Sequence, residues 1–148
     1  MIQPVKRDQR DQQRRKEYRA EWGVFSPGGV EPEPALPEID DVRCYGVSAI
    51  LQARPWCVAA RARREFKVLP GAPHQRRAKA HWGAWTIEVP RKRRHPWVVL
   101  HEVAHILTDG DQHGPAYAGT MVCLVRDQLG VEVASKLAAA YDRMGVKR

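Results

Sequence analysis

The chain has 148 residues, of which 43% are hydrophobic and 28% are charged, so it fits one globular domain rather than a disordered chain. It contains no run of roughly 18 apolar residues and its first residues are charged, so we expect neither a membrane-spanning segment nor a secretory signal. Three widely spaced cysteines without a CxxC pair indicate reduced thiols. We therefore expect a cytoplasmic protein that does not contact membranes.

The net charge of +8 is concentrated in the middle of the chain. Residues 54–94 contain twelve Lys and Arg residues against two Asp and Glu residues. Such a segment is typical of a surface that binds nucleic acid without sequence specificity, or of a surface that meets an acidic partner. It is equally typical of an ordinary solvated face of a basic protein. The sequence leaves these interpretations open.

The N-terminal part of the chain predicts two helices separated by a linker. Residues 1–22 predict a charged helix whose main apolar anchors are Tyr18 and Trp22. Residues 23–37 are rich in Pro and Gly, which is typical of a linker. A second, short helix is expected over residues 40–53, before a proline.

The rest of the chain predicts strands followed by helices. The strand candidates are residues 64–69 and residues 80–89, and the second shows an alternation of apolar and polar side chains. Three helices are then expected to begin near Pro96, Pro115 and Val131. This order of elements predicts an α+β single domain.

The stretch His101-Glu102-Val103-Ala104-His105 is the strongest indication of chemistry. Positions i and i+4 share one face of a helix, so both imidazoles can bind one metal ion. Glu102 lies about 100° around the helix, where it can take a proton from a metal-bound water. Zinc suits such a site because imidazole ligands leave a coordination position open. The competing interpretation, two exposed histidines on a surface helix, is less favoured because apolar residues surround the motif: Val98, Val99, Leu100, Val103, Ile106 and Leu107.

A third ligand is predicted at His113, eight residues after His105 and beyond an Asp-Gly turn. Asp111 is the alternative ligand. Asp109 or Asp111 can instead accept a hydrogen bond from the far nitrogen of a ligand imidazole and so fix its tautomer. The remaining histidines, at positions 74, 81 and 95, are interpreted as surface residues.

The stretch VVLHEVAHILTDGDQHGPAYAGTM resembles the core of a family of HEXXH-motif metallohydrolases found in actinobacteria and their phages. It is similar more broadly to SprT-type zincin metalloproteases. The N-terminal RDQQRRKEYRAE also resembles the opening of the actinobacterial family. The resemblance implies a zincin-like domain over residues 38–148, with a small antiparallel or mixed sheet packed on the motif helix and further helices around it. It implies the following site residues: zinc ligands His101, His105 and His113, catalytic Glu102, and an aromatic position at Tyr117.

These features predict a zinc-dependent hydrolase, in the bacterial host cell if a phage encodes it. The preferred activity is a peptidase that acts on peptides or proteins, with Glu102 as general base. The strand at residues 85–89 is expected either to pair with a substrate peptide or simply to pack in the sheet. Tyr117 is expected either to contact the transition state or substrate, or to pack in the core. The oligomeric state is left open.

The alternative function is a DNA-associated accessory protein. Its zinc would be structural, and the basic residues 54–94 would bind nucleic acid without sequence specificity. A closed structural site needs a fourth ligand, for which Cys123 is the nearest cysteine. Its position ten residues beyond His113 makes it a poor candidate.

Overall fold

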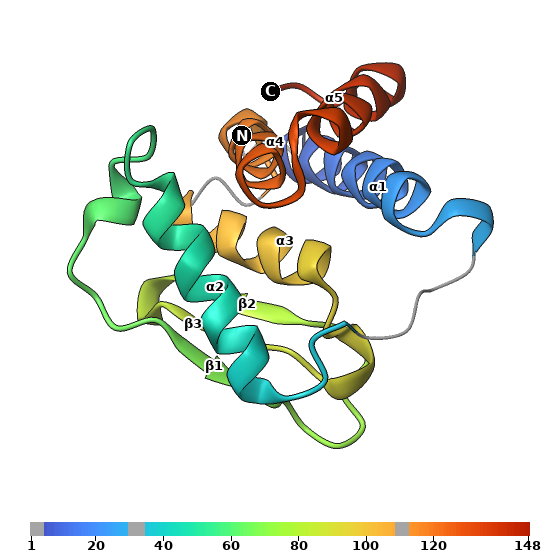
Figure 1. The fold of residues 1–148 in the computed structure, drawn as a ribbon. Coiled ribbons are helices and arrows are strands. Elements are labelled where there is room, and N and C mark those ends of the chain that lie inside the picture. The colour runs from blue at the N-terminus through green and yellow to red at the C-terminus, as the bar shows by residue number, and fades with distance from the viewer. Residues whose placement is uncertain (1–4, 30–34, 109–112) are drawn as a thin grey trace.

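The computed structural model describes residues 5–29, 35–108 and 113–148 (Figure 1). These residues form an α+β domain with five α-helices and a small mixed sheet. The helices are α1 (Val5–Phe25), α2 (Ile39–Ala53), α3 (Pro96–Leu107), α4 (Pro115–Leu129) and α5 (Val131–Met144), and the strands are β1 (Lys67–Leu69), β2 (Lys79–His81) and β3 (Thr86–Glu88). Among the helices described, none has the length and apolar character needed to cross a membrane.

The sheet has the strand order β1-β3-β2, so β3 is its central strand. β1 pairs with β3 in parallel, and β2 pairs with β3 in antiparallel orientation. The prediction of one continuous strand over residues 80–89 is therefore wrong. A short 3-10 turn (Trp82–Ala84) interrupts it, and Trp85 adopts a left-handed conformation with φ of 49°. This reversal folds the segment back on itself as two strands.

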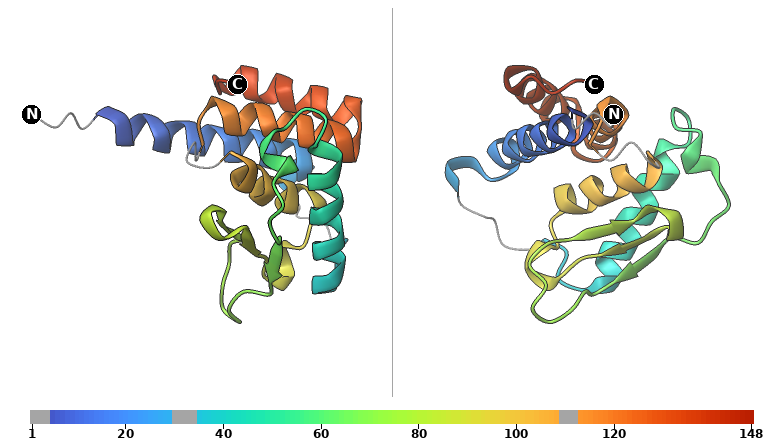
Figure 2. Two further views of the ribbon diagram at one scale, coloured as in Figure 1. Left: turned by 90° about the vertical axis from the view of Figure 1, so that its left-hand side faces the viewer. Right: turned by 180° about the vertical axis from the view of Figure 1, so that it is seen from behind.

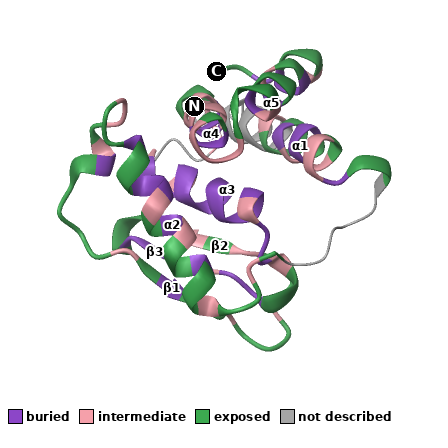
Figure 3. Cartoon of the chain, viewed as in Figure 1, coloured by how far each residue is buried: buried purple, intermediate pink, exposed green. Residues whose placement is uncertain are grey.

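Helix α3 occupies the middle of the molecule, as Figures 1 and 2 show. The sheet lies on one side of it and α1, α4 and α5 lie on the other, while α2 contacts both α3 and α4. Pro96 starts α3 with a ring suited to the first helical turn, and every residue from Trp97 to Ala104 is buried (Figure 3). Because α3 packs against the sheet, α2 and α4, it holds the motif in the core of the domain.

Helix α1 is polar along its length but still packs on the core. It contacts α5 and buries Ala20 together with two charged residues, Glu17 and Glu21. A buried carboxylate needs hydrogen-bond or ionic partners, because burial without them costs several kcal/mol or more. The burial of two glutamates on one face of α1 therefore indicates a polar site under this helix.

Candidate metal centre

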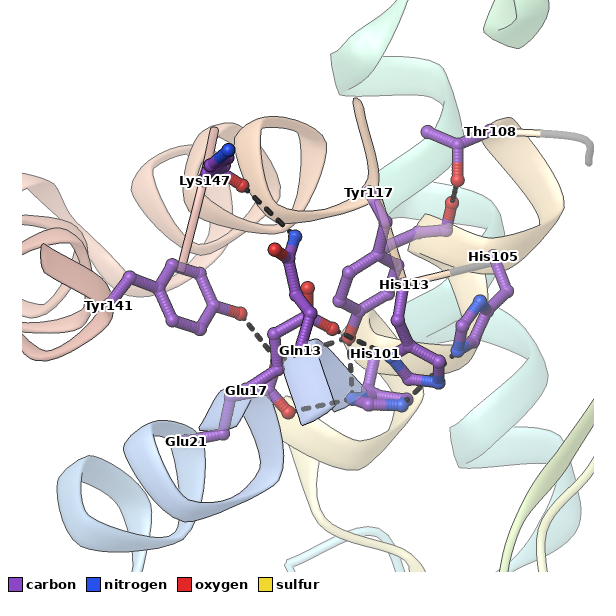
Figure 4. A network of polar contacts seen from close by, with 11 residues as sticks. Gln13, Glu17, Glu21, His101, His105, Thr108, His113, Tyr117, Tyr141 and Lys147 are labelled. Atoms are coloured by element: carbon purple, nitrogen blue, oxygen red, sulfur yellow. Dashed lines mark hydrogen bonds and ion pairs between the residues drawn. The ribbon is translucent and has the colours of Figure 1, made fainter. Parts of the chain in front are cut away.

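Three histidines meet beneath α1, two from α3 and one from the turn just before α4 (Figure 4). His101 and His105 lie one turn apart on α3, and their Nε2 atoms are 3.3 Å apart. His113 precedes Pro115, which begins α4 and returns the chain toward α3. One ring nitrogen from each histidine lies within 4.8 Å of the other two. This cluster can hold a metal ion.

The distance between the Nε2 atoms of His101 and His105 can be compared with the distance expected between two nitrogens that bind the same zinc ion. Two nitrogen ligands at about 2.0–2.1 Å from a tetrahedral zinc lie roughly 3.3–3.4 Å from each other. The distance of 3.3 Å between the Nε2 atoms of His101 and His105 agrees with this value. Among the described residues, the metal-binding cluster consists of these three histidines, which leaves room for a further ligand.

Two buried glutamates of α1 hold the outer nitrogens of two of these histidines. Nδ1 of His101 donates to Oε2 of Glu21 at 2.7 Å, and Nδ1 of His113 donates to Oε2 of Glu17 at 2.6 Å. Both glutamate side chains are fully buried. Each hydrogen bond places the ring proton on Nδ1 and directs the lone pair of Nε2 toward the cluster. Carboxylates hold metal-ligating histidines in this way.

Glu21 also connects the cluster to the tyrosines of α4 and α5. The hydroxyls of Tyr117 and Tyr141 both donate to Oε1 of Glu21, and the Tyr117 hydroxyl lies 2.6 Å from Nδ1 of His101. Tyr117 is fully buried. It does not line the cleft that lies beside the cluster and is bordered by His101 and Glu102. Of the two expectations for Tyr117, the geometry favours core packing, with an added role in orienting Glu21 and His101.

The electrostatics of the cluster reflect its burial. Burial lowers the pKa of His113 to about 3, with a further contribution from His101, so its imidazole stays neutral and able to bind a metal. Burial also acts against charge on His101, but the Glu21 carboxylate opposes it, and the pKa of His101 is raised. The ring of Tyr18 stacks on His101 at 4.9 Å between centroids and shields it from water.

Glu102 lies beside the cluster on the side of a cleft. Its side chain is buried, and this burial raises the pKa of Glu102 to about 7, although His101 opposes the shift. A carboxyl group with such a pKa can both accept and donate a proton near neutral pH. The cleft has a volume of about 710 Å³ and reaches both His101 and Glu102.

The other predicted site residues can be placed as follows. Asp109 and Asp111 lie outside the described residues, so neither their role as ligands nor their role toward an imidazole is tested. Cys123 is partly buried on α4 and does not belong to the metal-binding cluster. The strand at residues 85–89 was expected either to pair with a substrate peptide or to pack in the sheet. As β3 it packs between β1 and β2, which flank it on both sides, so the expectation of peptide pairing is wrong.

The three histidines interpreted as surface residues have different environments. His74 is exposed, and so is His81, whose Nε2 lies 2.8 Å from Oε2 of Glu88. His95 is buried at the start of α3, so that interpretation is wrong for His95.

The sequence interpretation missed Glu17 and Glu21. Their spacing of four residues, in Glu-Tyr-Arg-Ala-Glu, matches the spacing of His101 and His105 and puts both carboxylates on one helix face. In a helix this charged, that spacing does not distinguish a buried pair from two solvated glutamates. Only the packing of α1 over α3 shows that Glu17 and Glu21 are hydrogen-bond partners of the histidines.

Comparisons with known proteins identify no relative of this chain. No family model, no curated protein and no solved structure matches it.

Proposed function

We propose that this protein is a zinc-dependent hydrolase that cleaves peptide bonds, with a zincin-like arrangement of its motif helix. The observation that carries the proposal is the convergence of three imidazoles beside a cleft that His101 and Glu102 line. His101, His105 and His113 are the proposed zinc ligands. When bound, zinc lowers the pKa of its water toward about 7 and polarises a carbonyl group.

The residues of the chain have separate tasks in this proposal. Glu102 takes the proton of the attacking water on a carboxylate oxygen and passes it to the leaving amine, a task that suits its raised pKa. Glu17 and Glu21 hold His113 and His101 in the tautomer that binds a metal. Tyr18 excludes water from one face of His101.

An edge strand beside the cleft supports a polypeptide substrate. β2 is an outer strand of the sheet, and Ala78, the residue just before it, lines the cleft. The outer edge of such a strand carries backbone groups that can pair with an extended peptide. A peptide bound there would pass Glu102. The proposed edge is therefore that of β2, and not that of residues 85–89, for which pairing was one of two expectations.

The second candidate, a DNA-associated protein with a structural zinc, is less well supported. A structural zinc site is closed by four protein ligands, whereas the described cluster has three and borders a cleft. A general base next to the cluster has no purpose in a structural site. The basic residues remain compatible with nucleic acid.

The test is proteolysis by the zinc-loaded protein and by Glu102→Gln. The wild type should cleave members of a diverse peptide library, and Glu102→Gln should lose at least about 100-fold in rate while keeping its zinc. Glu132→Gln, an exposed substitution on α5, is the matched control and should keep full activity. Undiminished cleavage by Glu102→Gln, or a zinc-loaded wild type that cleaves no peptide in the library, would contradict the proposal.

A further inference from the structure

The cleft beside the metal-binding cluster is lined by five arginines. Arg14, Arg15 and Arg19 come from α1, on one side of the cleft. Arg77 precedes β2 and Arg93 belongs to the short turn before α3, on the sheet side. Nε of Arg93 donates to the backbone carbonyl oxygen of Arg76. This hydrogen bond joins the segment before β2 to the turn before α3. The arginines therefore come from parts of the chain that are distant in sequence.

Among the described residues, carboxylates form no salt bridge with most of these arginines. In the part of the chain that the structure describes, Arg15, Arg19 and Arg77 form no salt bridge, and their side chains are exposed. The two glutamates nearest to them on α1 are buried and bound to histidines. Like charges brought together in one cleft repel one another, and an anionic ligand relieves this repulsion.

Part of the lining of the cleft is apolar and aromatic. Tyr18, Trp22, Trp97 and Val98 contribute to it, and the ring of Trp22 meets that of Trp97 edge-on at 6.5 Å between centroids. The guanidinium of Arg14 lies over the ring of Tyr18 at 5.7 Å. Such a surface accepts an apolar side chain between charged ones. The guanidinium groups of the arginines around it can each bind a carboxylate with two parallel hydrogen bonds.

The geometry points to a substrate preference: the cleft binds extended polypeptide segments that carry Asp or Glu side chains, and directs them to Glu102. This inference rests on the proposed peptidase function and adds the chemistry of its substrate. Polypeptide is favoured over nucleic acid because Ala78, the residue just before the outer strand β2, lines the same cleft, and the outer edge of such a strand can pair with a peptide backbone. The arginines then select the side chains of that peptide.

The test uses pairs of short fluorogenic peptides that differ only by Asp→Asn and Glu→Gln. The zinc-loaded protein should cleave the acidic member with a kcat/KM at least about tenfold higher, a discrimination within the range of one charged hydrogen bond. The preference should shrink between about 0.05 M and 0.5 M salt, because screening weakens exposed charges. Arg15→Gln combined with Arg77→Gln should bring the acidic-to-neutral ratio close to one. Arg63→Gln, an exposed arginine outside the cleft, is the matched control and should leave the ratio unchanged.

Binding to Glu102→Gln provides a readout that does not depend on cleavage. Fluorescence anisotropy should show tighter binding of the acidic peptide than of its neutral partner, and the two arginine substitutions should remove the difference. Cleavage without any acidic preference would overturn this inference and leave the proposed function standing. Arginine-dependent binding of the acidic peptide, without cleavage of any peptide, would overturn the proposed peptidase function and leave the preference of the cleft for acidic polypeptides standing. A single-stranded oligonucleotide that binds more tightly through the same arginines, with no acidic peptide bound, would assign the cleft to nucleic acid and also overturn the inference.

Discussion

Glu21 on α1 and His101 on α3 form a buried hydrogen bond of 2.7 Å across 80 residues of sequence. Both side chains are almost completely shielded from water. Helix α1 therefore does more than cover the domain, because it supplies the groups that orient two imidazoles of the cluster that can hold a metal ion. Docking of α1 and assembly of the cluster are consequently coupled.

Removing the charge of Glu21 should weaken metal binding. Glu21→Gln keeps the size of the side chain but replaces a strong acceptor for the His101 Nδ1 proton, and such changes typically cost about 10–100-fold in metal affinity. Competition with a chromophoric zinc chelator measures the change. Glu132→Gln on the exposed face of α5 serves as the control. Wild-type zinc affinity in Glu21→Gln would show that this hydrogen bond does not orient a metal ligand.

The hydroxyl of Tyr141 should contribute to stability because it donates to the buried Glu21 carboxylate. Tyr141→Phe should lower the free energy of unfolding of the metal-free protein by about 1–3 kcal/mol, since an acceptor loses one partner in the core. Urea denaturation gives the value. Tyr45→Phe is the matched control, because the buried Tyr45 hydroxyl has no hydrogen-bond partner in the described part of the chain. That control should be neutral or stabilising, and equal effects of the two substitutions would contradict the account.

Replacing each of two helical glycines by alanine should change the stability of the protein in opposite directions. A Cβ at Gly46 of α2 would lie 2.5 Å from Cε1 of Phe66, whereas a Cβ at Gly119 of α4 meets no atom within 4 Å. Gly119→Ala should raise stability by up to about 1 kcal/mol through helix propensity. Gly46→Ala should lower stability by about 1–3 kcal/mol because the Phe66 ring must move. Thermal unfolding compares the two variants. A higher melting temperature for Gly46→Ala than for Gly119→Ala would show that the Phe66 ring does not restrict a Cβ at position 46.

Local patterns were sufficient to predict the helices and the motif. The apolar period and the flanking prolines placed α3, α4 and α5 close to their observed limits, because these signals act within a few residues. The i and i+4 histidines came together for the same reason. His113 joins them in one cluster, as its place after a turn indicated.

Long-range packing explains what the sequence did not reveal. The alternation over residues 80–89 suited a strand, but the left-handed Trp85 turns the chain, a conformation that nothing in the identity of a tryptophan predicts. Glu17 and Glu21 were invisible as site residues because their role depends on which face of α1 meets α3. The arginine-lined cleft likewise forms only when α1 lies opposite the sheet.

The most direct test of the account is the metal content of protein purified without a metal-affinity tag, measured by mass spectrometry. We predict about one zinc per chain in the wild type, as expected for one catalytic site. His113→Ala should lose the zinc, and Asp111→Ala and the exposed-site control His74→Ala should keep it. A wild type without zinc, or a His113→Ala variant that retains zinc while Asp111→Ala loses it, would contradict the three-histidine site.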